Sequence, residues 1–510
     1  MAWLLFFQLL AGVFVCTQAG LAVEERQAPA GITIVPADGF NLAITDEISP
    51  EYVVASQITP VHNWFAGNFT HLPVGKQVTI GIHLTADPEA KNTTDVNKWQ
   101  GLLPLMTYAD PTRYESYEWF HKDTRGRWIS GDPCKIGDEK LAGMGELPVQ
   151  QVIPAEQAQQ FLSTDRQYWM PWRDVDAAAA VPPLNIFRVQ QTFALPSASI
   201  AMRVPYTYTY QQAFLARLKA RQLPGVFIDE IGATREGRKL QILRLEDSTQ
   251  QTTPATHRTI IITGREHATE AASSWAVMGA LRALLADSAE ARALRQDTTW
   301  ILIPLVDPDG SVASVFDRLT EMFNTMAENS TLSPEALAYA RYFTDYVYRG
   351  HVIDIAVSVH NLEANEGPNV VCPLISYPNK IAVQDINRCF FDELTKQGLL
   401  VADPLTPWDF GWAQYRLYGW CAVNYGAIDL SFEVNDRYAK KRLSLAELQG
   451  IGGELARTLV RWTRSSTGER QRVRTSKLFR LQCLERDAYF SNPDHPLEAR
   501  TDADMVVRGF

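Results

Sequence analysis

The chain has 510 residues, of which 46% are hydrophobic and 21% are charged, the composition of an ordinary folded protein. That length exceeds what one hydrophobic core usually serves, so we expect two or three domains. The formal net charge is −10 and no stretch is strongly basic, which argues against a nucleic-acid-binding surface. We therefore expect no nucleic acid among the partners.

The chain begins with an apolar segment. Residues 1–22 contain the run Trp3 to Val15, followed by small and polar residues. The run has the length of a signal-peptide core and is shorter than the ~20 residues of a membrane span. We therefore predict a signal peptide over residues 1–22 and a secreted or periplasmic protein. An uncleaved N-terminal anchor is the alternative, because no Lys or Arg precedes the run; otherwise no stable membrane partner is predicted.

Residues 32–199 consist of short alternating runs separated by turn signals. Gln77 to Leu84 and Asn185 to Val189 are two examples. Several short strands at this spacing are typical of an all-β sandwich or barrel. We therefore predict an N-terminal β-sandwich-like domain over residues 32–199.

Beyond residue 204, strands alternate with helices, which predicts an α/β domain with a mixed, largely parallel sheet flanked by helices over residues 204–464. Residues 465–510 are charged with weak periodicity, and we treat them as a C-terminal extension of unknown structure. The predicted elements are a helix between Pro205 and Pro224, strands Gly225–Ala233, Lys239–Leu245 and Thr259–Thr263, helix Ala271–Ala286, strand Thr299–Val306, a turn at Asp307–Gly310, helix Pro334–Arg349, strand Val352–Val359, helix Val383–Gln397, a strand reaching Phe432, and a last helix starting at the capping box of Ser444 and Glu447.

The central strand Thr259–Thr263 ends at Gly264 and is followed by His267 and Glu270. An imidazole and a carboxylate three residues apart, at the carboxyl end of a central strand, can bind the same metal ion. A capping carboxylate beside a surface histidine would leave the same pattern. The pair alone is therefore weak support for a metal site.

Two later residues complete the requirements of a hydrolytic zinc site. His360 also follows a hydrophobic strand, so it can meet His267 at one edge of the sheet as a third ligand. Glu433 ends an apolar strand, where a carboxylate needs a positive partner that a zinc-bound water can supply. We assign Glu433 as general base, with an ion pair to Arg437 as the alternative. One zinc ion per chain is the predicted cofactor.

These residues together resemble the M14 family of zinc carboxypeptidases, with its H-x-x-E motif, distant histidine and late catalytic glutamate. Arg265 to Trp275 is similar to the R-x-H-P-G-E-x-x-x-S-W element of the cytosolic-carboxypeptidase branch, although Ala268-Thr269 replaces Pro-Gly. Asn63-Trp64-Phe65 and the junction Ala201–Tyr208 also look like that branch. The resemblance implies a zinc-carboxypeptidase fold behind the N-terminal β-sandwich.

The resemblance also implies an activity, namely hydrolysis of residues from the C-termini of peptides or proteins. Zinc on His267, Glu270 and His360 would activate water, and Glu433 would move its proton to the leaving amine. Arg318 loosely matches the arginine that polarises the scissile carbonyl. One alternative is a zinc deacylase of N-acyl amino acids; another is a secreted, non-catalytic binding protein with a degenerate site.

The substrate-binding residues match the family less closely. The family turn usually begins with Asn, and here it begins with Asp307. The family's D-L-N-R element is matched only by Asn324, without its arginine, and Arg437 is a candidate replacement for that carboxylate clamp. Arg416 lies where the branch has A-R-V ahead of its catalytic strand. In the side-chain pocket it would favour an acidic terminal residue; a solvated surface arginine is the alternative.

Overall fold

The structure of the protein is a computed structural model. The described residues are 31–58, 64–83, 105–107, 119–122, 128–131, 170–171, 186–193, 195–246, 257–316, 318–319, 322–323, 332–362, 370–371, 379–399, 401, 415–438, 441–443, 445–466 and 468. The predicted signal segment, residues 1–22, and almost all of residues 465–510 lie outside them.

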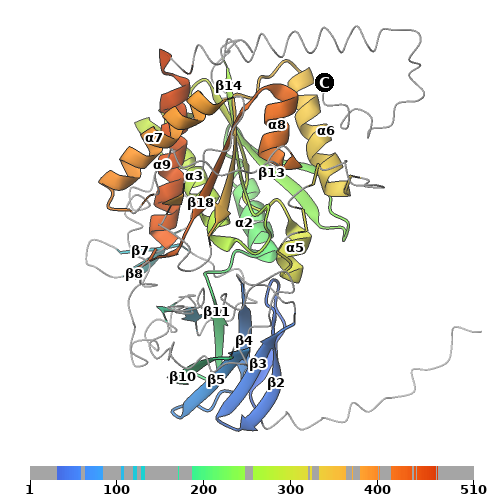
Figure 1. Cartoon of the computed structure of the whole chain (residues 1–510), viewed down its shortest axis with the longest axis vertical. Helices are drawn as coiled ribbons and strands as arrows, with labels where there is room; N and C mark the ends of the chain where they lie inside the picture. Colours follow the sequence, from blue (N-terminus) through green and yellow to red (C-terminus); the bar gives the residue numbers. More distant parts are fainter. Residues whose placement is uncertain are drawn as a thin grey trace, which may run out of the picture.

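The described part of the N-terminal region has one antiparallel sheet, one mixed sheet and a separate hairpin (Figure 1). The first has the order β1-β4-β11-β6-β9 and the second β10-β5-β3-β2. Apolar side chains of both sheets, including Phe69, Ile80, Ile82 and Ile200, belong to one buried cluster. The strands are β1 (Thr33–Val35), β2 (Leu42–Ser49), β3 (Tyr52–Gln57), β4 (Ala66–Thr70), β5 (Gln77–His83), β6 (Leu105–Thr107), β9 (Met170–Pro171), β10 (Ile186–Thr192) and β11 (Ser197–Ala201), with a separate hairpin of β7 (Trp119–Lys122) and β8 (Trp128–Gly131).

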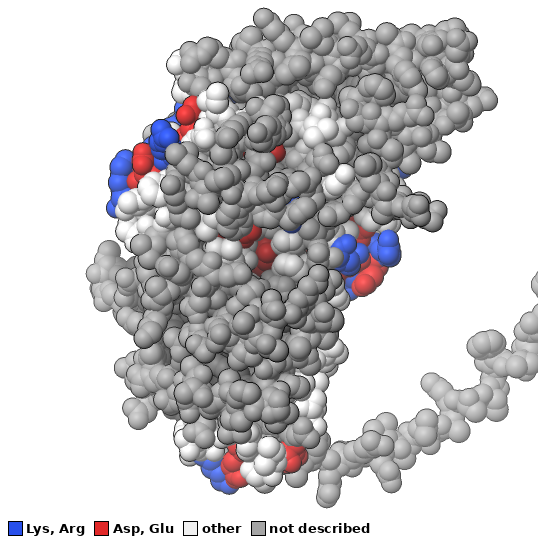
Figure 2. Space-filling model, in the orientation of Figure 1, with Lys and Arg blue, Asp and Glu red and all other residues white. Residues whose placement is uncertain are grey.

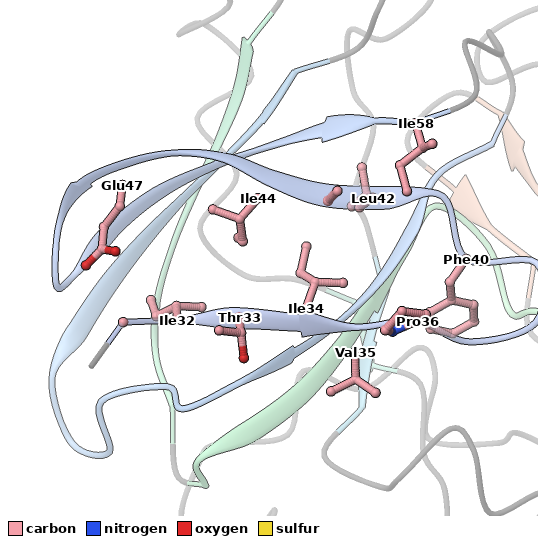
Figure 3. A pocket seen from close by; sticks show the side chains of 12 residues that line it. Ile32, Thr33, Ile34, Val35, Pro36, Phe40, Leu42, Ile44, Glu47 and Ile58 are labelled. Carbon is pink, nitrogen blue, oxygen red and sulfur yellow. The ribbon is translucent and has the colours of Figure 1, made fainter. Parts of the chain in front are cut away.

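A pocket of about 360 Å³ lies in this N-terminal region. Figure 3 shows Ile34, Leu42 and Ile44 directed at the space between β1 and β2, with Glu47 at one end. The predicted metal ligands and general base are not among its lining residues. This pocket is therefore separate from the predicted zinc site.

A seven-stranded sheet forms the centre of the second region, in the order β12-β13-β15-β14-β16-β18-β17. The four middle strands, β15, β14, β16 and β18, run parallel, while β12, β13 and β17 are antiparallel to their neighbours. The prediction of a mixed, largely parallel sheet is confirmed. The strands are β12 (Val226–Ala233), β13 (Lys239–Leu245), β14 (Arg258–Gly264), β15 (Thr298–Ile303), β16 (Ile355–Asn361), β17 (Val370–Val371) and β18 (Ile428–Val434).

Strand β14 lies at the middle of this sheet because its side chains can be buried on both faces. Every residue of Arg258–Gly264 is buried, and parallel neighbours pair with it on both sides. A run of β-branched residues suits such a position, because these side chains pack well against neighbouring strands and because neither face of the strand needs to contact water. The carboxyl end of β14 therefore opens at the centre of one sheet edge.

Helices cover both faces of the sheet (Figure 1). One face packs against α2, α3, α4, α7 and α9, and the other against α6 and α8, as the two buried clusters show. The helices are α2 (Tyr208–Ala220), α3 (Ala271–Leu285), α4 (Ala289–Arg295), α5 (Pro308–Ala313), α6 (Pro334–Tyr348), α7 (Lys380–Lys396), α8 (Leu417–Tyr425) and α9 (Leu445–Thr463); a small hairpin of β19 (Arg437–Tyr438) and β20 (Lys441–Arg442) precedes α9.

One local prediction is corrected by the structure. The sequence Asp307–Gly310 was expected to be a turn, but Asp307 is the N-cap of α5, and its side chain accepts a hydrogen bond from Gly310 N. Proline at the first helical position and aspartate at the cap suit a helix start as well as a turn. A turn and a helix start favour the same residues here, so the sequence alone does not distinguish between these two structures.

Figure 2 shows Lys and Arg next to Asp and Glu at several places on the described surface of one face. Among the described residues, no helix is both long and apolar enough to cross a membrane.

The N-terminal region is joined to the second region by buried contacts around Gly39. The Trp64 indole N–H and the Ser314 hydroxyl both donate to Gly39 O, at 2.8 and 3.0 Å. Gly39 N donates to Val312 O at the end of α5, at 3.3 Å. Trp64 also belongs to the same buried cluster as Trp275 of α3. The two regions therefore share part of one core.

Candidate metal centre

Three side chains converge beyond the carboxyl end of β14. His267 Nδ1 lies 2.7 Å from Glu270 Oε1, and His360 Nδ1 lies 3.2 Å from Glu270 Oε2. The two Nδ1 atoms are 3.3 Å apart. His267 and Glu270 come from the loop between β14 and α3, and His360 comes from the end of the neighbouring strand β16. The predicted ligand set is thus brought together by two adjacent parallel strands.

The spacing of these donor atoms fits a tetrahedral zinc ion. Ligands at ~2.0–2.1 Å from zinc lie about 3.4 Å from one another in a regular tetrahedron. The three donor atoms lie within 4.8 Å of one another. Their separations are 2.7, 3.2 and 3.3 Å, and the two longer ones are close to the ~3.4 Å of a tetrahedron. Two imidazoles and one carboxylate are also a donor set found in catalytic zinc sites. The residues present therefore fit the ion.

Burial and charge set the protonation states that a metal requires. Burial lowers the pKa of His360 to about 4, although Glu270 opposes the change. Burial raises the pKa of Glu270, but His267 and His360 together lower it further, so that its pKa ends below the ordinary value. A neutral imidazole and an ionised carboxylate at neutral pH are the metal-binding forms of these groups.

Glu270 is the N-cap residue of α3, but its side chain makes no capping hydrogen bond. Its carboxylate instead faces the two imidazoles, and Oε2 also accepts from Asn361 N at 3.1 Å. The capping alternative left open by the sequence does not describe this side chain.

Arg265 holds the ligand loop in shape. Its backbone has a φ of 65°, in the left-handed region that is unfavourable for a residue with a Cβ atom. Its buried guanidinium donates to Ala268 O at 2.5 Å, Tyr206 O at 2.9 Å and Ser311 Oγ at 2.7 Å. These bonds tie the loop to the junction segment and to α5. Burial lowers the pKa of Arg265 to about 10, so it remains charged at neutral pH.

Glu433 lies beside the centre on the next strand. In the parallel ladder of β16 and β18, Glu433 is the direct partner of His360. Paired residues on adjacent strands direct their side chains to the same face of a sheet. Glu433 therefore shares a face and an edge of the sheet with a predicted ligand, and it is partly buried.

Arg416, at the start of α8, is buried against the two histidines and is not a solvated surface residue. Only 4% of it is exposed. Its Nη1 lies 3.2 Å from His360 Nε2, and its Nη2 lies 3.4 Å from His267 Nε2. The predicted substrate-binding arginine thus lies on the side of the imidazoles that faces away from Glu270.

The sequence reading did not single out Glu266 or Ser358, which lie behind the ligands. Ser358 Oγ is 3.0 Å from His360 Nε2. Glu266 is fully buried and accepts from Thr263 Oγ1 at 3.3 Å. Burial raises the pKa of Glu266, while Arg416, His267 and hydrogen bonding from Ser358 and Thr263 oppose the rise. Their proximity follows from the pairing of Thr263 with Ser358 in the β14–β16 ladder, which the sequence does not reveal.

Arg318 is held by acidic groups. Its Nε and Nη2 donate to Asp307 Oδ1 at 3.0 and 2.5 Å, and Nη2 also donates to Glu335 Oε1 at 2.9 Å. Burial lowers the pKa of Arg318, but Asp307 and Glu335 raise it above its ordinary value. Asp307, which replaces the family's asparagine, therefore fixes the position of this arginine.

Two predicted substrate-binding residues cannot be located in the same way. Asn324 lies outside the described residues, and so does the side chain of Arg437, whose backbone belongs to β19. Their assigned roles stay predictions.

The fold and the group of His267, Glu270 and His360 are those expected of a zinc peptidase domain. Residues 212–332 match the family model of the M14 peptidases, described as zinc carboxypeptidase. The chain therefore contains an M14 zinc carboxypeptidase domain, as the resemblance in the sequence implied. Its homologues are metallocarboxypeptidases, hydrolases of peptide bonds, and the family supports zinc as the predicted cofactor.

Curated relatives match a limited stretch of the chain. Human cytosolic carboxypeptidase 6 is 31% identical over 106 residues, which are 21% of this chain and 21% of the relative. Mouse cytosolic carboxypeptidase 3 is 28% identical over 134 residues, which are 25% of this chain and 13% of the relative. The chain thus matches about a fifth or less of the length of these relatives.

Solved structures cover most of the fold. A metallo-carboxypeptidase from Burkholderia cenocepacia aligns with a TM-score of 0.57 at 16% identity, over 85% of this chain and 99% of that one. A metallo-carboxypeptidase from Pseudomonas aeruginosa aligns with a TM-score of 0.51 at 15% identity, over 84% and 98%. These likenesses support the α/β carboxypeptidase-like fold.

The predicted location is wrong by these comparisons. We expected a secreted or periplasmic protein with a signal peptide over residues 1–22. The curated relatives are, by name, cytosolic carboxypeptidases, which argues against secretion. An apolar run of signal-peptide length is a compositional pattern, and it does not by itself establish export.

Proposed function

We propose that this protein is a zinc-dependent metallocarboxypeptidase that releases residues from the C-termini of peptides or proteins in the cytoplasm. The main support is that donor atoms of His267, Glu270 and His360 lie within 4.8 Å of one another, and that the first two residues lie in the stretch that matches the zinc carboxypeptidase family model. The deacylase and binding-protein alternatives gain no support from the comparisons.

In this proposal the zinc ligands, Glu433 and Arg318 have separate roles in the hydrolysis. Zinc, when bound by the three ligands, supplies a Lewis acid that lowers the pKa of a water molecule towards ~7 and polarises the scissile carbonyl. The Glu433 carboxylate takes the proton of the attacking water and returns it to the leaving amine. Its pairing with His360 on the adjacent strand supports this role. Arg318 is proposed to stabilise the oxyanion, with its Nε and Nη2 held by Asp307 and Glu335.

Substrate selection is a second part of the proposal. Arg416 is proposed, from its place in the sequence, to meet the terminal residue of the peptide, where its charge would favour an acidic residue. In the structure it contacts the Nε2 atoms of both histidines. Asn324 and Arg437 are proposed to hold the terminal carboxylate, on the basis of their places in the sequence. We also propose that the two N-terminal sheets form a β-sandwich, because they share one apolar cluster.

The first experiment measures metal content and product together. We expect elemental analysis to give one zinc per chain in the wild type and a loss of zinc in His360→Ala, because that variant lacks one of three ligands. Peptides ending in Glu, Lys or Phe are then digested, and mass spectrometry should find the release of single C-terminal residues, fastest for Glu. Zinc without such release would contradict the carboxypeptidase assignment; zinc retained in full by His360→Ala would contradict the ligand set.

A further inference from the structure

Glu266 is a buried carboxylate that the mechanism above does not use. Its side chain is fully buried, and in the sequence it directly precedes the predicted ligand His267. Its Oε1 accepts from Thr263 Oγ1, but Oε2 has no hydrogen-bond partner among the residues that the structure describes. A buried polar atom without a partner destabilises a folded protein, so such an atom calls for an explanation.

Ser358 lies between Glu266 and a metal ligand. It precedes His360 by two residues on β16, so both side chains point to the same face of the sheet. Its Oγ is 3.0 Å from His360 Nε2. Ser358 also pairs with Thr263, whose hydroxyl donates to Glu266 Oε1, and Ser358 is close enough to lower the pKa of the Glu266 carboxyl. The serine hydroxyl is therefore the one group in this set that can both accept from the imidazole and donate to the carboxylate.

The tautomer of His360 decides whether this chain of hydrogen bonds is complete. A neutral imidazole that presents the Nδ1 lone pair to a metal carries its proton on Nε2. That N–H can donate to Ser358 Oγ, which leaves the serine proton free for Glu266 Oε2. In the other tautomer the serine would donate to His360 Nε2, and Oε2 would stay unpaired. The buried carboxylate is satisfied only in the tautomer that binds metal.

We propose that Glu266 and Ser358 are positioning residues that hold His360 in its metal-binding tautomer. The inference rests on the zinc site of the proposed function, and it adds two residues behind that site. Metal-binding histidines commonly donate their second N–H to such an outer acceptor, and loss of the acceptor typically weakens metal binding 10–100-fold.

Arg416 makes the contribution of Glu266 more important. A guanidinium has only donors, so the contact of Arg416 Nη1 with His360 Nε2 fits only the tautomer that does not bind metal. Arg416 therefore favours one state of this nitrogen, and Ser358 together with Glu266 favours the other. The Glu266 carboxyl gives the serine proton an acceptor, since its Oε2 has no other hydrogen-bond partner among the described residues. Replacing that carboxyl should shift the balance towards the unproductive tautomer.

The test compares zinc affinity, by competition with a chromophoric chelator, in wild type, Glu266→Gln and Ser358→Ala. We expect each variant to bind zinc at least tenfold more weakly. Ser358→Thr, which restores the hydroxyl, should stay within about threefold of wild type. Glu335→Gln is the matched control, because Glu335 is also fully buried with an unpaired Oε2 but contacts none of the ligands in the described structure. It should bind zinc like the wild type.

Two further measurements separate positioning from a general loss of structure. The double variant Glu266→Gln with Ser358→Ala should bind zinc no more weakly than the weaker single variant, because both belong to one chain of hydrogen bonds. The cobalt-substituted proteins should show a changed visible absorption spectrum for the two variants and an unchanged spectrum for Glu335→Gln. If Glu266→Gln does not fold, the comparison of Ser358→Ala with Ser358→Thr tests the same chain.

The outcomes distinguish the inference from the function beneath it. A wild-type protein without zinc affinity would overturn the proposed function itself. Normal zinc affinity in the wild type together with unchanged affinity in Glu266→Gln and Ser358→Ala would overturn only the positioning inference. Equal weakening in Glu335→Gln, or additive losses in the double variant, would also overturn it.

Discussion

At the scale of single residues, the two carboxylates nearest the metal centre have different surroundings. Glu270 is buried against two imidazoles and a backbone N–H, and the two imidazoles keep its pKa below the ordinary value, which suits the proposed role as a ligand. Glu433 is only partly buried at the end of β18. We propose that this difference in burial separates the ligand Glu270 from the proton carrier Glu433.

Glu433→Gln should therefore abolish most turnover without loss of zinc. The amide keeps the size of the side chain but cannot accept the proton of water, and general-base catalysis typically contributes 10²–10⁴-fold to a rate. We expect kcat on a susceptible peptide to fall by about that factor, while zinc content stays at the wild-type value. Persistent turnover would show that another group is the base, and loss of zinc would show that Glu433 is a ligand.

The lowered pKa of His360 predicts a pH dependence of stability in the metal-free protein. Its pKa is about 4 in the folded protein and about 6.5 in an unfolded chain. Between these values the unfolded state binds more protons, so stability falls as the pH falls from 6.5 to 4, by up to about 3 kcal/mol. The lowered pKa of Glu270 adds a loss in the same direction below about pH 4.5.

Urea unfolding with a chelator present, at pH 7, 6, 5 and 4.5, measures this loss. In His360→Gln the part of the slope that lies above pH 5 should disappear, because glutamine does not titrate. An equal slope in the variant would assign the effect to other groups.

At the scale of elements, the sequence predicted best where periodicity and burial agree. Strand β13 was predicted with the same bounds, Lys239–Leu245, and α3 ends one residue before the predicted end. Helix α8 was not predicted, because Leu417–Tyr425 is apolar on nearly all sides and shows no amphipathic face. Helix α5 has only six residues, too few for a periodic signal.

The same distinction holds for the candidate site. His267 and Glu270 are three residues apart, so local spacing was enough to pair them. Ser358 meets Glu266 only through the register of β14 with β16, a long-range pairing that leaves no mark in the local sequence. The contacts of Arg416 with the histidines and of Arg318 with Asp307 and Glu335 also join residues that are not neighbours in the local sequence, so the sequence does not reveal them. The sequence was therefore enough to predict the ligand set, and the structure was needed to find the residues that lie behind it.

The packing of α3 against α9 gives a prediction for this scale. An added Cβ at Gly452 of α9 would collide with the carbonyl oxygen of Ala276 in α3, whereas a Cβ at Gly450 would meet no atom within 4 Å. Because two helix backbones cannot separate without losing buried contacts, Gly452→Ala should destabilise the protein by about 2 kcal/mol or more.

Gly450→Ala is the control in the same helix. Alanine favours helix over glycine by ~1 kcal/mol, so this variant should be neutral or slightly more stable. Denaturant unfolding of the two variants checks the pair. Equal stability would mean that the helices can move apart at little cost.

At the scale of the whole molecule, the N-terminal region and the α/β region are joined by buried polar and apolar contacts. Arg203 Nε donates to Asp436 Oδ1 at 2.7 Å, and both side chains are almost fully buried. Asp436 follows β18, which also provides Glu433. Breaking one partner of such a buried pair typically costs 3–5 kcal/mol, because the other charge is left without compensation. The connection between the regions thus reaches close to the proposed general base.

This shared core predicts that the described regions unfold together. Trp64 comes from the N-terminal region, yet its ring packs in the cluster of α3 and its indole N–H donates to Gly39 O. Trp64→Ala should therefore lower the melting temperature of the zinc-sensitive transition, since replacing a buried aromatic by alanine costs about 3–5 kcal/mol. Lys76→Ala is the control, because Lys76 forms an exposed ion pair with Glu51 in the same region and should change stability by less than about 1 kcal/mol.

Calorimetry with zinc and with chelator identifies which transition contains the metal site, because a ligand that binds only the folded state raises the melting temperature of the unit that holds it. If the regions are coupled, the wild type shows one zinc-sensitive transition, and Trp64→Ala moves it downwards with and without zinc. If they are independent, Trp64→Ala splits off a transition that zinc does not affect and leaves the zinc-sensitive one where it was. In the coupled case, a substitution far from the ligands weakens the metal centre through the core that the two regions share.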